Sequence, residues 1–273
     1  MHRVWLILGA MILGSTITAC GDGDADTRVA GSVPSSVSVP SSVSDVSVAD
    51  AVDARELLYI SDSSGWKVGE AYARHAEEAL GVPVRLVSWR VPSMGLVQAR
   101  QMIADYPEKV AAADIVVLWG HMLDTGARED GLFACATGDP AVQFEPYTPE
   151  DWAPYVDLLV QTFDEIRTLR DGEPTVLRAV DLYVPVLAKW RASGVDDRCI
   201  AFMESQTAAI RTAAEAAGVT MVSVFDALNG PAHDQDPVTA GYILSDGEHL
   251  TDAGGEVAAA ALAAAGFEPD PAP

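Results

Sequence analysis

Residues 57–65 read Leu57-Leu58-Tyr59-Ile60-Ser61-Asp62-Ser63-Ser64-Gly65, a short apolar run followed at once by small polar residues. An apolar run of this length, ended by Ser and Asp, is typical of a buried strand. Apolar or small residues then recur every three to four positions from Gly65 to Leu80, which predicts a helix. This stretch therefore predicts a strand, a tight turn and a helix.

Short apolar runs alternate with helical patterns along the rest of the chain. Such alternation is typical of a parallel sheet with helices on both faces. We therefore predict an α/β fold, a three-layer α/β/α sandwich with a parallel five-stranded sheet. The expected strands are 57–60, 84–89, 115–119, 175–180 and 220–224, and the expected helices are 65–80, 98–105, 110–113, 149–169, 206–217 and 255–265.

Length and charge exclude several classes of protein. The 273 residues allow one domain with extensions at its ends. Forty acidic residues against 17 Lys and Arg give a net charge of −23, which repels phosphate backbones, so we expect no nucleic-acid partner. The one apolar segment suited to a membrane lies at the N-terminus, which excludes a polytopic membrane protein.

The first twenty residues have the layout of a secretory signal, with Arg3 followed by an apolar stretch and small residues. Residues 17–20, Ile-Thr-Ala-Cys, resemble a bacterial lipobox. The resemblance implies a lipoprotein signal peptide over 1–19, lipidation of Cys20, and an extracytoplasmic protein anchored to the bacterial cell membrane. A simple membrane anchor, or an ordinary cleaved signal with Cys20 incidental, is the alternative.

Residues 20–53 are expected to form a flexible tether after the lipidated Cys20. The segment is rich in Ser, Val and Pro and contains Val-Pro-Ser-Ser-Val-Ser twice, with no helical period. The folded domain is expected to span 54–267, followed by a disordered tail over 268–273.

Two cysteines remain in the expected domain, Cys135 and Cys199. An exported protein meets an oxidising compartment, so one disulfide between them is the simplest prediction. Two separate buried thiols are the alternative.

Polar residues directly after strands are the places to seek chemistry, because ligands of open parallel sheets bind beyond the carboxyl ends of the strands. Ser63 lies on such a turn, and the amides at the start of the following helix point at the same place, where they can stabilise an oxyanion. Alternatively, these serines only cap the helix.

A second polar cluster, Ser245-Asp246-Gly247-Glu248-His249-Leu250-Thr251, precedes the last helix, with Thr251 placed to cap it. Asp246 and His249 are three residues apart and can lie side by side on a turn. The carboxylate then accepts from one ring nitrogen and leaves the other as a base. The alternative is a surface turn with a solvated His.

The pairing of Ser61-Asp-Ser63 with Asp246-Gly-Glu-His249 resembles the SGNH/GDSL hydrolase superfamily, over about residues 55–267. The resemblance implies a flavodoxin-like fold and the chemistry of a serine ester hydrolase, such as an esterase, lipase or acetylesterase. It makes Ser63 the nucleophile, His249 the general base and Asp246 the acid that orients it.

The same resemblance assigns the oxyanion hole to Ser63, Gly95 and His121. Gly95 follows the second expected strand, and His121 follows the third, where the family usually has an Asn that this chain lacks. Two other departures are Ser61, where the family has Gly, and Ser64, where it has Leu.

The predicted function is hydrolysis or transfer of an acyl or acetyl ester, on a small molecule, a glycan or a lipid, by a membrane-tethered enzyme. Two alternatives are a non-catalytic lipoprotein that binds a carbohydrate or an envelope partner in the same cleft, and a structural surface lipoprotein. We expect no cofactor and no metal, because His233, Asp234 and Asp236 lie beside Gly and Pro in what looks like a turn.

Overall fold

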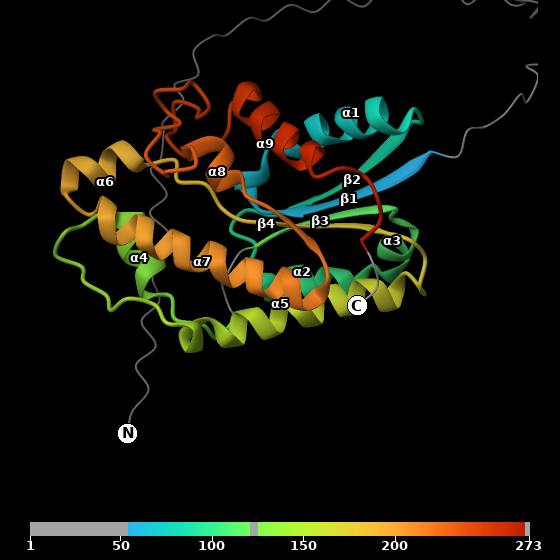
Figure 1. The fold of residues 1–273 in the computed structure, drawn as a ribbon, viewed down its shortest axis with the longest axis horizontal. Helices are drawn as coiled ribbons and strands as arrows, with labels where there is room; N and C mark the ends of the chain where they lie inside the picture. The colour runs from blue at the N-terminus through green and yellow to red at the C-terminus, as the bar shows by residue number, and fades with distance from the viewer. Residues whose placement is uncertain (1–53, 121–124, 271–273) are drawn as a thin grey trace, which may run out of the picture. The chain divides into compact units, whose positions relative to one another are not determined.

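The computed structural model describes residues 54–120 and 125–270. Its five strands are parallel and lie in the order β2-β1-β3-β4-β5 (Figure 1). This is the strand order of flavodoxin-like sheets, so the predicted five-stranded parallel sheet is confirmed. The strands are β1 (Arg55–Ser61), β2 (Val84–Arg90), β3 (Ile115–Trp119), β4 (Val176–Val180) and β5 (Thr220–Val222).

Helices cover both faces of the sheet. Side chains of each strand alternate between the two faces, so each strand contributes to the packing on both. Leu58 and Ile60 pack with one set of helices, whereas Leu57 and Tyr59 pack with the other. On the first face lie α2 (Leu96–Asp105), α3 (Pro107–Ala112), α4 (Asp130–Thr137), α5 (Pro149–Leu169), α6 (Leu187–Ser193) and α7 (Asp196–Ala217). On the second lie α1 (Val68–Leu80), α8 (Val224–Asn229) and α9 (Asp252–Ala264), as Figure 1 shows.

The first helix begins later than the sequence predicted. Residues Ser63–Gly65 form a single 3-10 turn, η1. Lys67 then adopts the left-handed conformation, with φ 75°, and α1 starts at Val68. A backbone of opposite hand cannot continue a helix, so the turn that holds Ser63 is separate from α1.

The second half of the chain also differs from the sequence-based expectation. Helix α7 starts ten residues earlier than expected, and the short helices α4, α6 and α8 were not expected at all. Strand β5 ends at Val222 because Ser223 caps α8, its hydroxyl accepting from the amide of Asp226.

Cys135 and Cys199 form the predicted disulfide, with their Cα atoms 5.5 Å apart. Both side chains are buried. The bond joins α4 to α7, so the separate buried thiols considered above are excluded in this structure.

The expectation of a disordered tail from 268 is wrong for residues 268–270. The Asp270 carboxylate accepts hydrogen bonds from the amides of Leu177 and Thr220, at the starts of β4 and β5. It also pairs with the guanidinium of Arg178 at 2.9 Å, with both side chains at least 95% buried. Asp270 therefore fastens the end of the domain to the sheet.

The predicted signal peptide, Cys20, the tether over 20–53 and residues 271–273 lie outside the described residues. Within residues 54–120 and 125–270, no helix combines the length and the apolar character needed to span a bilayer.

Candidate active site

Ser63 lies just beyond the carboxyl end of β1, in the segment 61–65 that we call the serine loop. The cap of its 3-10 turn is Asp62, whose side chain accepts from the amide of Ser64 at 2.8 Å and from the Ser64 hydroxyl at 2.6 Å. The sequence left open whether these serines only cap the helix. The structure gives the capping role at this turn to Asp62. The Ser64 hydroxyl is committed to this carboxylate, whereas Ser63 is half-buried on the same turn.

The serine loop accommodates Ser61 because residue 65 is glycine. A Cβ atom at Gly65 would lie 2.6 Å from the Ser61 hydroxyl oxygen and 2.7 Å from that of Tyr59. Such contacts are too short for real atoms, so the missing side chain provides the space that Ser61 needs. Tyr59 further holds the turn by donating to the carbonyl of Gly65 at 3.2 Å.

Asp246 and His249 lie side by side, as predicted, in the segment 244–250 that we call the Asp–His loop. The Nδ1 atom of His249 is 2.9 Å from Oδ2 of Asp246. A carboxylate accepts, so Nδ1 carries the hydrogen, and the lone pair of the neutral ring is then on Nε2. That is the tautomer a general base needs.

Main-chain contacts fix the Asp246 carboxylate. Oδ1 accepts from the amides of His249, at 3.0 Å, and of Glu248, at 2.9 Å. These amides, together with the His249 ring, lower the pKa of Asp246 to about 2. Asp246 is therefore ionised at every pH at which an imidazole titrates.

The Asp–His loop is closed by a short antiparallel bridge between Ile243 and Leu250, both of them buried. Gly247 has φ 78°, a left-handed conformation that favours glycine. The Thr251 hydroxyl accepts from the amide of Gly254 at 3.1 Å and caps α9, as predicted. The Asp–His loop is therefore held by the bridge between Ile243 and Leu250 and by its connection to α9.

The serine loop and the Asp–His loop meet at Tyr183. The Tyr183 hydroxyl is 2.9 Å from the carbonyl oxygen of Glu248 and 3.4 Å from that of Ser64, so its hydrogen is shared between the two loops. Burial raises the pKa of this hydroxyl above its ordinary value, which keeps the donor protonated. Two segments almost two hundred positions apart therefore lie beside one another.

An aromatic contact also joins the two loops. The ring of Trp66, which directly follows the serine loop, lies 6.0 Å from the ring of His249 in an edge-to-face arrangement. The guanidinium of Arg90 stands 5.5 Å from the same indole ring. Trp66 remains 45% exposed.

Of the predicted oxyanion donors, Gly95 and Ser63 are described and His121 lies outside the described residues. Gly95 is buried and stands directly before α2. The amide of Val91 donates to the carbonyl of Ser61 at 3.2 Å, and Met94 then donates back to Val91 at 3.1 Å. The turn that carries Gly95 is therefore attached to the serine loop.

A groove of about 410 Å³ opens between the two loops and the end of β4. Asp62 and Ser64 lie at this groove on one side, and Asp246 and Glu248 on another. Its other walls come from segment 182–186 and from α4, α6 and α7.

Sequence reasoning missed Tyr183 and Asp181, two polar residues in the segment that follows β4. Asp181 is fully buried and accepts from the hydroxyls of Thr207 and Ser223 and from the amides of Val224 and Phe225. Burial raises its pKa to about 6. Only their position in the sequence could have indicated these two residues, because both follow a strand at the edge of the sheet where ligands bind.

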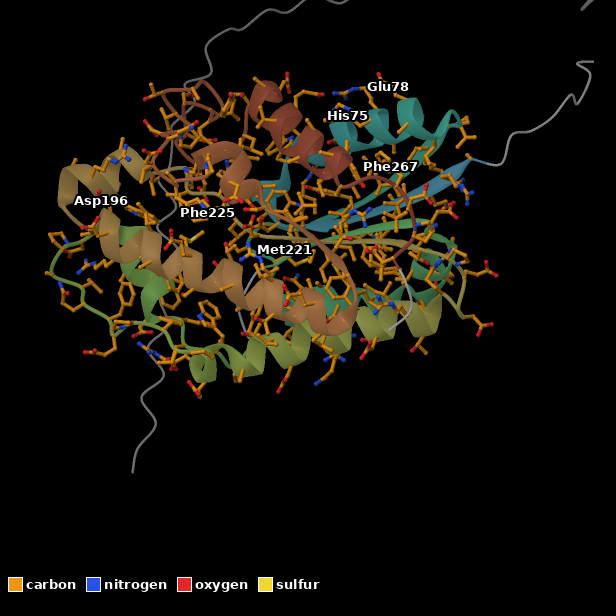
Figure 2. The ribbon with its side chains drawn as sticks, in the orientation of Figure 1. His75, Glu78, Asp196, Met221, Phe225 and Phe267 are labelled. Carbon is orange, nitrogen blue, oxygen red and sulfur yellow. A yellow bond between two sulfur atoms is a disulfide. The ribbon has the colours of Figure 1, made fainter. Side chains whose placement is uncertain are left out.

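The other described histidines do not join this site. His75 lies on α1, as Figure 2 shows. Its Nε2 atom is 2.6 Å from a carboxylate oxygen of Glu256. His233 stacks on Phe225 and sits between Glu204 and Asp226, with ring nitrogens 3.0 and 2.8 Å from their carboxylates. Asp234 and Asp236 do not share those contacts with His233.

The fold matches solved structures of lipases and esterases. The lipase Lip_vut3 from a goat rumen metagenome aligns with a TM-score of 0.58 and 18% identity, covering 78% of this chain and 98% of the lipase. The acetyl xylan esterase AlAXEase aligns with a TM-score of 0.52 and 16% identity, covering 77% and 99%. TesA aligns with a TM-score of 0.50 and 14% identity, covering 77% and 97%.

No protein-family model matches the sequence. No curated protein sequence matches it either. Because the identities to the solved structures are this low, the likeness concerns the fold. The chain therefore has the three-layer α/β/α fold that these lipase and esterase structures share, as the resemblance to the SGNH/GDSL superfamily predicted.

Proposed function

We propose that the protein is a serine ester hydrolase in which Ser63 is the nucleophile, His249 the general base and Asp246 the residue that orients it. The observation that carries the proposal is the Asp246–His249 hydrogen bond on a loop that Tyr183 joins to the serine loop. The lipase and esterase structures with the same fold add support.

In the proposed reaction, the Ser63 oxygen attacks the ester carbonyl while its proton moves to Nε2 of His249. The tetrahedral intermediate then collapses, and the alcohol leaves with that proton. Water attacks the acyl-enzyme, again giving its proton to His249, and the carboxylic acid leaves as the proton returns to Ser63. Asp246 stabilises the imidazolium in both halves of the cycle.

Negative charge on the carbonyl oxygen needs hydrogen-bond donors. The amides of Ser63 and Gly95 are our candidates, together with the side chain of His121. A neutral imidazole can donate one such bond in place of the family's Asn. Removing one donor of this kind typically slows the reaction by a factor of about 10² to 10³.

Covalent labelling with a fluorophosphonate tests the assignment, since this reagent bonds to an activated serine and releases fluoride. We expect the full chain to be labelled at Ser63 and Ser63→Ala to be unlabelled. Ser64→Ala should still be labelled, because the Ser64 hydroxyl only donates to Asp62. An unlabelled wild type, or a label that persists in Ser63→Ala, contradicts the proposal; a wild type that binds esters without cleaving them favours the binding protein.

We also propose that the protein is exported and anchored through a lipid on Cys20. The lipobox-like sequence supports this proposal, as does the disulfide between Cys135 and Cys199, since such bonds are rare in the cytosol. A clickable fatty acid supplied to a bacterial host should label the wild type but not Cys20→Ser. Equal labelling of the two proteins, or none in either, would overturn the anchor.

A further inference from the structure

Resting on the proposed function, we propose that the groove between the serine loop and the Asp–His loop holds the acyl part of the substrate, and that this part is an uncharged apolar chain longer than acetyl. Each carbon of such a chain fills about the space of one water molecule, about 30 Å³. By this measure the groove of about 410 Å³ has room for roughly a dozen carbons, far more than an acetyl group needs.

The chemistry of the groove walls favours an apolar occupant. Its floor includes Trp190, Phe202 and Met203, which belong to the hydrophobic core and are at most 7% exposed. Leu182 and Val186 add half-buried apolar surface. Because the floor is part of the packed core, the groove exists before a ligand binds.

The position of the groove relates it to the proposed reaction. Asp62 and Ser64, on either side of Ser63, line it together with Asp246 and Glu248, so the walls include neighbours of both proposed reacting residues. An ester carbonyl between the two loops would leave its acyl chain to run along the wall formed by α4, α6 and α7. The disulfide between Cys135 and Cys199 holds α4 against α7, which keeps the distance between those walls fixed.

The charge of the groove disfavours an acidic acyl chain. Three carboxylates line it, those of Asp62, Asp246 and Glu248, and none of its described lining residues is Lys, Arg or His. A second carboxylate on the substrate would meet like charges and no cation among these described lining residues. The groove therefore favours a fatty acyl ester over an ester of a dicarboxylic acid with the same number of carbons.

The test compares p-nitrophenyl acetate, butyrate, hexanoate and octanoate with the full chain. Burying a methylene group changes an equilibrium by about fourfold. We therefore expect kcat/KM to rise about fourfold per added methylene up to hexanoate. The mono-p-nitrophenyl ester of adipic acid, which has the same number of carbons as the hexanoate, should react at least tenfold more slowly.

A matched pair of variants shows whether this groove is responsible. Ala136 is exposed on α4 and lines the groove, whereas Ala208 is exposed on α7 and lines a separate pocket beside Trp152. Ala136→Trp should lower kcat/KM for hexanoate at least tenfold and change that for acetate less than twofold. Ala208→Trp should change neither by more than twofold.

The outcomes separate this proposal from the function on which it rests. If fluorophosphonate labels Ser63 but acetate is cleaved faster than hexanoate, the acyl groove is wrong and the proposed hydrolase stands. The same holds if Ser63 is labelled but Ala136→Trp and Ala208→Trp have the same kcat/KM values. Equal rates for hexanoate and the adipate ester overturn the charge argument. A wild type that is neither labelled nor active overturns both proposals.

Discussion

Tyr183 donates its hydroxyl hydrogen to the main-chain oxygen of Glu248, 2.9 Å away, in the residue directly before His249. The same hydroxyl is 3.4 Å from the carbonyl oxygen of Ser64. A single buried side chain from the end of β4 therefore sets where the imidazole stands relative to the serine loop. We regard Tyr183 as a positioning residue, since it acts through the two loops.

Tyr183→Phe should lower kcat about three- to tenfold and leave KM nearly unchanged, because one net hydrogen bond is worth about 1 kcal/mol. The rate of fluorophosphonate labelling should fall by the same factor. Tyr155→Phe is the matched control, since the buried Tyr155 hydroxyl has no hydrogen-bond partner among the described residues. Equal effects of the two substitutions on kcat would show that Tyr183 only packs.

Gly65→Ala should reduce both stability and labelling of Ser63. The new Cβ atom would lie 2.6 Å from the Ser61 oxygen, and overpacking of this kind costs about 1–3 kcal/mol. Adding Ser61→Gly should recover part of the loss, but not all, because Tyr59 also lies 2.7 Å from that atom. Denaturant unfolding of the wild type, the two single variants and the double variant gives the coupling free energy between positions 61 and 65. Additive effects on the free energy of unfolding would contradict the contact between these two residues.

Asp246→Asn should lower kcat by several orders of magnitude without unfolding the domain, because it removes the acceptor that selects the His249 tautomer. The pH profile of the wild type gives an independent check. Asp246 has a pKa of about 2, so this carboxylate stays ionised from pH 8 down to about pH 4, and its protonation cannot cause a loss of activity in that range. A protonated imidazole cannot accept the proton of Ser63, so kcat should fall as the pH is lowered, and a flat profile over this range would argue against His249 as the base.

Asp181 should make the protein less stable as the pH rises from about 4 to 6. Its pKa is raised to about 6 by burial, so in this range the folded state holds a proton that the unfolded chain has already released. A shift of about two units corresponds to about 3 kcal/mol. Urea unfolding between pH 4 and 7 should show this fall in the wild type and a smaller one in Asp181→Asn; identical pH dependence would contradict it.

Asp270→Ala should destabilise the domain by about 3–5 kcal/mol, because it leaves the buried guanidinium of Arg178 without its charged partner. It also leaves the amides of Leu177 and Thr220 without their acceptor. Glu268→Ala, at an exposed position two residues earlier, should change stability by less than about 0.5 kcal/mol. Chemical denaturation of the two variants compares them directly.

The sequence predicted the elements whose pattern is local. The five strands contain short apolar stretches, and the Asp246–His249 pair lies within one turn, so the local sequence indicated both. The elements it missed, α4, α6 and α8, have at most eight residues. A helix of two turns is too short for a hydrophobic period to show.

What the sequence did not predict depends on contacts between distant segments. The fit of Ser61 depends on the absence of a side chain at Gly65, and the role of Tyr183 depends on two carbonyl groups brought together by the fold. The tail over 268–273 looked disordered because it is short and rich in Pro. Asp270 is ordered by the buried charge of Arg178, which no local pattern reveals.

The position of Asp270 also affects the order of events during synthesis. Arg178 lies in β4, but its counter-ion is made more than ninety residues later. A nascent chain that ends before Asp270 would have to bury an uncompensated cation in order to complete its central strands. We therefore expect the sheet to consolidate only after the ribosome has added residue 270.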